Sequence, residues 1–114
     1  MENNNFFNFN IKLNTIKLAE VKYNVPNNPG IYVIYESGKM IKIGQTVHLR
    51  NRLQGYYLCK SNDCEFSRYI TYLNRDNMII QWKEYGKESI SDIETLMVKV
   101  ANANNIDLLC WKRK

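Results

Sequence analysis

The stretch Gly30–Leu53, GIYVIYESGKMIKIGQTVHLRNRL, decides the fold of this chain. Residues 31–36 are rich in β-branched and aromatic side chains, and they predict a strand. Ser37-Gly38 marks a turn, and residues 40–44 predict the returning strand. A helix is expected over residues 47–57, with Thr46 as its N-cap. The stretch therefore predicts a β-hairpin that is followed directly by a helix.

The register of the hairpin can be argued from burial, because side chains alternate between the faces of a strand. A two-residue loop at Ser37-Gly38 with regular pairing would bury Lys42 among apolar side chains. A register one residue longer, with a three-residue loop or a bulge, separates the faces better, and we expect it. The apolar face then carries Ile31, Val33, Tyr35, Ile41 and Ile43, and the other face carries Tyr32, Ile34, Met40, Lys42 and Gly44.

In this register Tyr32 and Lys42 share the face that is not the core face, with Gly44 opposite Tyr32. A glycine there would leave space above the tyrosine for a ligand. A nearby ammonium stabilises a phenolate and lowers the ordinary tyrosine pKa of about 10, so that Tyr32 would act as a base toward water. The simpler interpretation is a half-buried strand tyrosine and a surface lysine.

The helix after the hairpin carries a polar stripe. His48, Arg52 and Tyr56 are spaced four apart, and Arg52 lies at the edge of the apolar side of the helix. A guanidinium suits a phosphate because its planar fork donates two hydrogen bonds to two oxygens. The alternative is an amphipathic helix whose arginine reaches along the surface into water.

Outside this stretch the chain predicts further helices and a third strand. We expect short helices over residues 15–23 and 63–73, a strand over residues 77–85, and a helix over residues 91–103. The apolar tail Leu108–Trp111 is a candidate edge strand. The length of 114 residues suits one domain. The fold class is therefore α/β (α+β), a small three-stranded antiparallel sheet flanked by helices.

The last predicted helix contains a carboxylate on its apolar side. Glu94 falls between Ala101 and Val98 on the helical wheel. A carboxylate that points to the interior needs a cation or a metal as partner. Ser91 and Glu94 also fit a capping box, in which the glutamate reaches back to the helix start. Both interpretations remain open.

Positive charge is concentrated in one part of the chain. The net charge is +5, and residues 37–62 hold five basic residues and no acidic one, so the remainder sums to zero. Such focused charge suits a polyanion such as nucleic acid, or is simply a solvated basic face. Three cysteines and one histidine predict free thiols rather than a zinc site. No run approaches the roughly 20 apolar residues of a membrane span, so a cytoplasmic location is expected.

These features, in this order and spacing, resemble the GIY-YIG nucleases. The motif residues are Pro29-Gly30-Ile31-Tyr32, Lys42-Ile43-Gly44-Gln45-Thr46, Arg52 eight positions after Gly44, Tyr56 one turn later, and Glu94 on a later helix. Lys42 replaces the second motif tyrosine, as it does in some similar restriction-type members. Asn102, Asn104 and Asn105 are candidates for the family's late asparagine, although none has the usual flanking pattern. The resemblance implies a single domain over residues 1–114 with a core of about residues 29–103.

The resemblance implies a metal-dependent endonuclease that hydrolyses DNA, including branched or single-stranded DNA. Glu94 would bind one Mg²⁺ or Mn²⁺, Tyr32 would act as general base tuned by Lys42, Arg52 would neutralise charge on the phosphate, and Tyr56 would position phosphate or water. Lys39, His48, Arg50 and Lys60 are the expected nucleic-acid contacts. A homodimer or a protein partner would supply specificity. The alternatives are a binding module of the same fold that does not cut, and a small interaction domain without either role.

Overall fold

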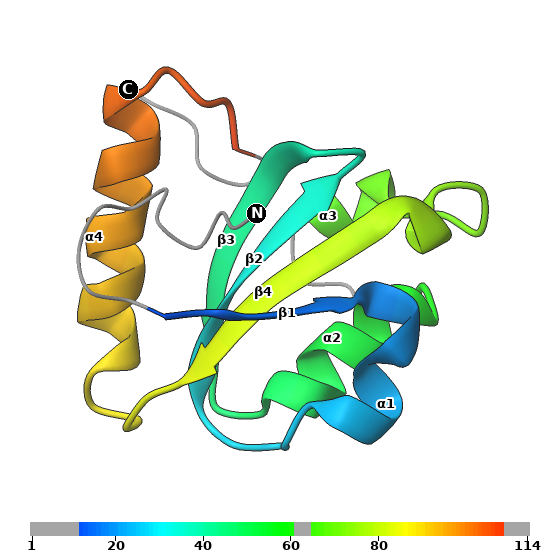
Figure 1. Ribbon diagram of the computed structural model, residues 1–114, viewed down its shortest axis with the longest axis horizontal. Coiled ribbons are helices and arrows are strands. Elements are labelled where there is room, and N and C mark those ends of the chain that lie inside the picture. The colour runs from blue at the N-terminus through cyan, green and yellow to red at the C-terminus, as the bar shows by residue number, and fades with distance from the viewer. Residues whose placement is uncertain (1–11, 61–64, 109–114) are drawn as a thin grey trace.

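A computed structural model describes residues 12–60 and 65–108 of the chain (Figure 1). Its centre is an antiparallel sheet in the order β1-β4-β2-β3. The strands are β1 (Asn14–Lys17), β2 (Gly30–Glu36), β3 (Lys39–Thr46) and β4 (Met78–Glu84). The predicted α/β class is thereby confirmed, but the sheet has four strands and not three.

The additional strand β1 lies in a segment that the sequence predicted to be helical. Lys17 pairs with Ile79 and Ile16 with Ile80, so β1 satisfies the outer edge of β4. The rest of the predicted helix is split into a short 3₁₀ helix η1 (Leu18–Glu20) and one turn of helix, α1 (Val21–Asn24). Pairing with a distant strand overrode a weak helical periodicity, since an open edge of β4 would leave backbone groups unpaired.

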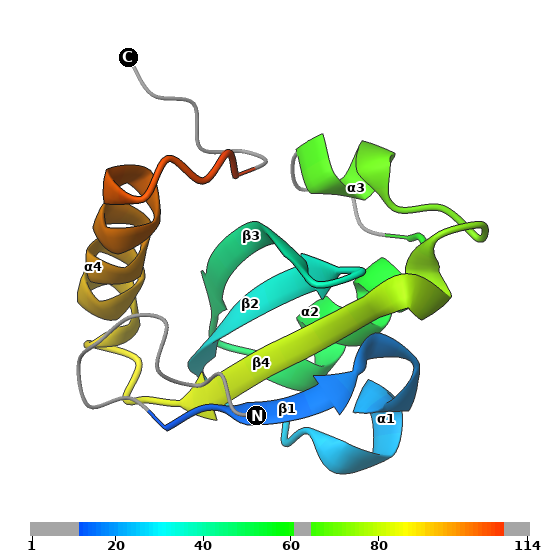
Figure 2. The ribbon, with the colours of Figure 1, turned by 45° about the horizontal axis from the view of Figure 1, so that its top comes forward.

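Helices cover both faces of the sheet, as Figures 1 and 2 show. They are α2 (Leu49–Tyr57), α3 (Glu65–Tyr69) and α4 (Ile90–Ala103), and a second 3₁₀ turn, η2 (Arg75–Asn77), leads into β4. Consequently there are two core clusters, one on each face. Tyr32 and Ile34 pack with the α2 side chains Leu49 and Leu53, whereas Ile31, Val33 and Ile43 pack with Met97 and Ala101 of α4.

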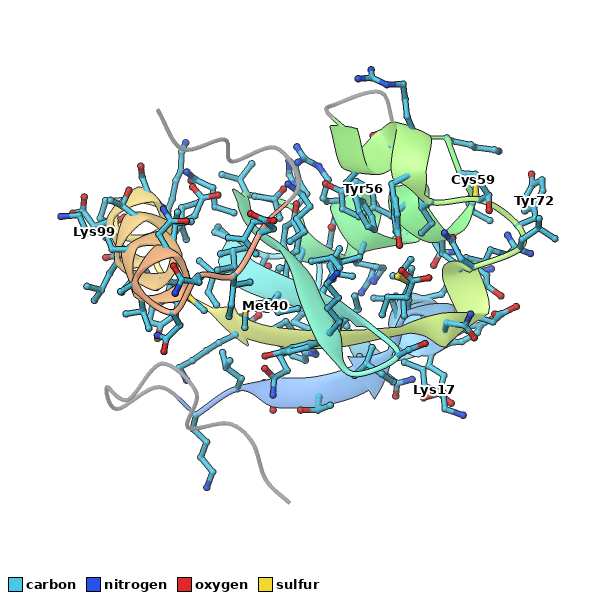
Figure 3. All side chains as sticks on the ribbon, turned by 90° about the horizontal axis from the view of Figure 1, so that it is seen from above. Lys17, Met40, Tyr56, Cys59, Tyr72 and Lys99 are labelled. Atoms are coloured by element: carbon cyan, nitrogen blue, oxygen red, sulfur yellow. The ribbon has the colours of Figure 1, made fainter. Side chains whose placement is uncertain are left out.

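This arrangement corrects the prediction that the face of Tyr32 is not a core face. Tyr32 is fully buried and Lys42 is 6% exposed, because α2 and α3 cover this side of the hairpin. In Figure 3, Tyr56 of α2 lies on the side of α3 and Met40 lies toward α4. The hairpin is therefore buried on both sides over most of its length.

The expected pairing holds in the half of the hairpin that carries the motif. Tyr32 pairs with Gly44, Val33 with Ile43, and Ile34 with Lys42. A bulge then shifts the register between Ile34 and Tyr35. The bulge alternative is thus confirmed, whereas the longer loop is wrong: the loop has two residues, and Ser37 (φ 51°) and Gly38 (φ 86°) both lie in the left-handed region that a tight hairpin turn requires.

The bulge also exchanges two side chains between the faces. Met40 packs with Ile31 and Val33 on the α4 side, and Ile41 packs with Tyr32 and Ile34 on the α2 side. The predicted register places Met40 on the face of Tyr32 and Ile41 on the opposite face. An inserted residue reverses the face of every side chain beyond it, so the error is confined to the part of β3 nearest the turn.

The helix boundaries refine the predictions. Helix α4 begins at Ile90 with Ser89 at the N-cap position, so the capping box of Ser91 and Glu94 is wrong. Helix α2 begins at Leu49, and Thr46 instead accepts a hydrogen bond from the His48 backbone N–H to its Oγ1 at 3.0 Å. Helix α3 is shorter than predicted, although residues 63–64 lie outside the described ranges.

Two further expectations concern the C-terminal edge strand and membrane-spanning helices. Leu108 is buried and belongs to no strand, while residues 109–111 of the predicted edge strand lie outside the described residues. None of the helices within residues 12–60 and 65–108 is long and apolar enough to cross a membrane.

Candidate functional site

A pair of tyrosine hydroxyls forms the centre of the candidate site. The hydroxyls of Tyr32 on β2 and Tyr56 on α2 are 2.9 Å apart and hydrogen-bonded. The rings meet edge to face with centroids 6.0 Å apart, and the Tyr56 ring meets Phe66 of α3 in the same way at 4.8 Å. Both tyrosines are fully buried, so α3 closes this side of the pair.

Gly44 permits this position of Tyr32. A Cβ atom at Gly44 would overlap both the Cζ and the hydroxyl oxygen of Tyr32, because these atoms lie well inside van der Waals contact of that position. The tyrosine ring therefore lies directly against the Gly44 backbone. The expectation of open space for a ligand above the tyrosine is wrong, since the tyrosine itself occupies that space.

Arg52 is the partly exposed member of this group. Burial alone would lower the pKa of its guanidinium, but the charge interaction with Tyr32 and hydrogen bonding with Tyr56 and Tyr32 outweigh burial and raise the pKa. The arginine stays cationic and lies beside both hydroxyls. His48, which was expected on the same stripe, is exposed and precedes the first turn of α2.

Glu94 and Gln45 form the second half of the site. Glu94 on α4 is 8% exposed, and its Oε1 accepts a hydrogen bond of 2.8 Å from Gln45 Nε2 on β3. Burial raises the pKa of the carboxyl, while the Gln45 hydrogen bond and the charge of Lys42 lower it in part. Glu94 therefore has a neutral donor and a neighbouring cation, as the predicted orientation toward the interior requires.

Strand β3, one of the two edge strands of the sheet, carries residues of both halves. Lys42 and Gly44 are on the face of Tyr32, and the alternating Gln45 is on the face of α4. Gln45 is a site residue to which the sequence analysis assigned no role. The sequence contains the information that could have identified Gln45. It directly follows the motif glycine, and the alternation of side chains along a strand turns it toward the helix that carries Glu94.

The donor set around Glu94 can be compared with the needs of a divalent cation. No group of three or more His, Cys, Asp or Glu residues that could hold a metal ion occurs in the described part of the chain. One carboxylate still fits Mg²⁺, which commonly keeps several waters and takes one or two carboxylates together with substrate phosphates. Cys59 is a free thiol, and Cys64 and Cys110 lie outside the described residues.

The four residues expected to contact nucleic acid are all exposed and are spread over the surface. Lys39 is next to the hairpin turn, His48 and Arg50 are at the start of α2, and Lys60 follows its end. Arg50 also donates from Nε to the Val25 carbonyl oxygen at 3.0 Å, so it helps to fix the segment before β2. The structure thus gathers the proposed catalytic residues in two linked groups and leaves these cations at separate points.

Comparison with known proteins shows that part of this chain is similar to a short segment of one relative. The UvrABC system protein C of Caldicellulosiruptor saccharolyticus is 42% identical over 43 residues, which are 37% of this chain and 7% of that protein. No protein-family model and no solved structure matches the chain. The chain is therefore similar to a short segment of a much longer relative.

Proposed function

We propose that this protein is a metal-dependent endonuclease of the GIY-YIG type that hydrolyses DNA phosphodiester bonds. The observation that carries the proposal is the buried hydroxyl pair of Tyr32 and Tyr56 with the Arg52 guanidinium beside it. The similarity to a protein of the UvrABC system over 43 residues adds independent support.

In this proposal Tyr32 is the general base. The positive charge of Arg52 favours the phenolate form of Tyr32, and Lys42 is on the same face of the hairpin. In that form the Tyr56 hydroxyl would donate the hydrogen bond that joins the two oxygens. The phenolate takes a proton from the attacking water. Because Tyr32 is fully buried, water reaches it only after a neighbouring side chain moves, and the partly exposed Arg52 is the candidate.

Two further residues have roles in this proposal: Arg52 toward the phosphate and Glu94 toward the cation. Arg52 binds the phosphate oxygens and offsets the charge that develops on them. Glu94 would hold Mg²⁺ or Mn²⁺, and Gln45 donates a hydrogen bond to one of its two carboxylate oxygens. The bound cation would act as a Lewis acid on the phosphate and stabilise the leaving oxygen.

A nicking assay on supercoiled, branched and single-stranded DNA with Mg²⁺ or Mn²⁺ tests this proposal. Tyr32→Phe and Glu94→Gln should each reduce cleavage by about 100-fold or more, because each removes a group used in the chemical step. Tyr23→Phe and Asp92→Asn are the matched controls, since both residues are exposed, and Asp92 is on the same helix as Glu94. Cleavage that survives both site variants would point to a contaminating nuclease.

The burial of Tyr32 favours one alternative, a nucleic-acid-binding module of the same fold that does not cut. That module would bind DNA in a salt-sensitive manner without a divalent cation, since phosphate contacts release counterions whether or not cleavage follows. Its signature is binding in EDTA together with no nicking under either metal ion. The same substrates and protein preparation distinguish the two functions.

A further inference from the structure

Two exposed large side chains lie in the loop between α3 and η2. Tyr72 is 69% exposed and the adjacent Leu73 is 93% exposed. Figure 3 shows Tyr72 at the edge of the molecule, beyond Cys59, on the same side of the sheet as Tyr56. Large apolar side chains left in water at one place commonly mark a binding surface rather than a packing need.

The exposed ring is held by an arginine with two aromatic neighbours. The guanidinium carbon of Arg75 lies 4.2 Å from the ring centroid of Tyr57 and 4.6 Å from that of Tyr72. Arg75 Nη1 also donates to the Tyr57 carbonyl oxygen at 2.8 Å, and the Tyr57 hydroxyl donates to Asp76 at 2.8 Å. We call Tyr57, Arg75 and Tyr72 the Tyr72 platform.

The loop that carries Tyr72 is fixed before any ligand arrives. The Asn74 side chain accepts a hydrogen bond from the Thr71 backbone N–H at 2.8 Å and donates to the Tyr69 carbonyl oxygen at 3.1 Å. The Thr71 hydroxyl accepts from the Leu73 backbone N–H at 3.2 Å. A preorganised aromatic ring gives up little conformational entropy on binding, which favours its use as a contact surface.

We propose that the Tyr72 platform stacks against an unpaired base, so that the protein binds DNA with a single-stranded segment. Every base offers a flat face, and a tyrosine with an arginine against it is the combination that single-strand-binding surfaces use. The platform contains the cation Arg75, and Arg68 and Lys60 precede it in the chain, at the end of α3 and just after α2. Asp76, which accepts from the Tyr57 hydroxyl, is an acidic residue in contact with it.

The platform is directly connected to the candidate active site. Tyr56 and Tyr57 are consecutive residues of α2, one hydrogen-bonded to Tyr32 and the other stacked on Arg75. A base held at Tyr72 would therefore lie at the end of the same helix that presents Arg52. The inference rests on the proposed function and deepens it, because it names a junction between paired and unpaired DNA as the substrate class.

Fluorescence anisotropy with a labelled oligothymidine and a labelled duplex, both in EDTA, tests the inference without cleavage. Tyr72→Ala should weaken binding of the single strand by about 5-fold or more, since removal of one stacking side chain has that effect, and leave duplex binding unchanged. Tyr72→Phe should bind the single strand as tightly as the wild type, because it keeps the aromatic ring. Tyr23→Ala is the matched control, because Tyr23 is 83% exposed and has Lys22 over its ring at 5.4 Å.

Equal binding of the single strand by wild type and Tyr72→Ala would overturn the inference and leave the surface to a protein partner. A parallel weakening on both the single strand and the duplex would also overturn it, because a general phosphate contact would explain it. The proposed nuclease fails separately, by absence of nicking. Nicking is measured on the wild-type protein with Mg²⁺ or Mn²⁺ and strand binding is measured in EDTA, so the two failures are distinguishable.

Discussion

At the scale of single residues, the proposed chemistry depends on a few close contacts that tolerate little change. Gly44 lets the Tyr32 ring lie against the strand, and this contact fixes the position of the hydroxyl that is hydrogen-bonded to Tyr56. Gln45 makes the corresponding contact for Glu94 on the opposite face. Two consecutive residues of β3 therefore position the two proposed catalytic groups.

Gly44→Ala should destabilise the protein by about 1–3 kcal/mol, because the new methyl group overlaps a tyrosine that is packed in the core. Urea denaturation measures the change. Gly55→Ala is the control: a Cβ at Gly55 meets nothing within 4 Å and lies in α2, so it should stabilise by about 0.5–1 kcal/mol. Equal effects of both substitutions would contradict the packing argument.

Tyr35 should make stability depend on pH in the alkaline range. Burial raises its pKa to about 12, and its hydroxyl donates to Gln81 Oε1 at 2.9 Å. The stabilisation from the neutral phenol is complete below the unfolded value of about 10 and disappears as the pH rises toward 12. Tyr35→Phe lacks this titration, so the stability difference between wild type and variant should shrink from pH 10 to pH 12.

Urea denaturation of both proteins across this pH range makes the comparison. The difference between the two is informative because burial also raises the pKa of Tyr85, which remains in both proteins. A difference that stays constant above pH 10 would show that Tyr35 ionises equally easily in the folded and unfolded chain.

At the scale of elements, the hairpin shows how local and tertiary preferences combine. Its turn places Ser37 and Gly38 in the left-handed region, as a two-residue hairpin loop requires. The bulge beyond the turn keeps both Lys42 and Gly44 on the face of Tyr32. A tight turn and the motif register are therefore compatible only because β3 contains one extra residue.

Ser37→Asn should stabilise the hairpin, because it produces the Asn-Gly pair that this turn type favours and because asparagine tolerates a positive φ better than serine. The expected gain is about 0.5–1 kcal/mol, measured as a higher melting temperature. Ser37→Val serves as the opposite variant and should destabilise, since a β-branched residue is strained there. A gain from valine would refute the turn assignment.

At the scale of the whole molecule, the sheet separates two cores, while the edge strand β3 connects the two groups of proposed site residues. Helix α2 brings Arg52 and Tyr56 to one face, and α4 brings Glu94 to the other. Because β3 is at the edge, its Lys42 affects a carboxylate that packs on the opposite layer. A central strand would have kept these groups apart.

Long-range electrostatics at this scale predict how the proposed DNA binding should depend on salt. Replacing both Lys39 and Lys60 by glutamine should lower the slope of log K against log salt concentration by about 1 for each phosphate that is no longer neutralised. The control replaces Lys22 and Lys87, which are equally exposed but outside residues 37–62. Titrations at several salt concentrations give the slopes, and equal slopes for both double variants would exclude a role for the basic stretch.

The sequence by itself determined the hairpin, the helix after it, and the position of Arg52 at the edge of the apolar side of that helix. It also predicted β4, α4 and the burial of Glu94. These features depend on periodicity and turn chemistry, which act between residues a few positions apart. Local patterns are sufficient because each element presents one apolar side, and only one register separates that side from the polar one.

Only the tertiary structure decided what lies against each side chain. Strand β1 exists because β4 offers it an edge, Tyr32 is buried because helices cover its face, and Gln45 meets a carboxylate 49 positions away. The stack of Arg75 on Tyr57 and Tyr72 likewise joins separate segments. Such contacts gain free energy only when distant segments pack together, so no local pattern in the chain specifies them.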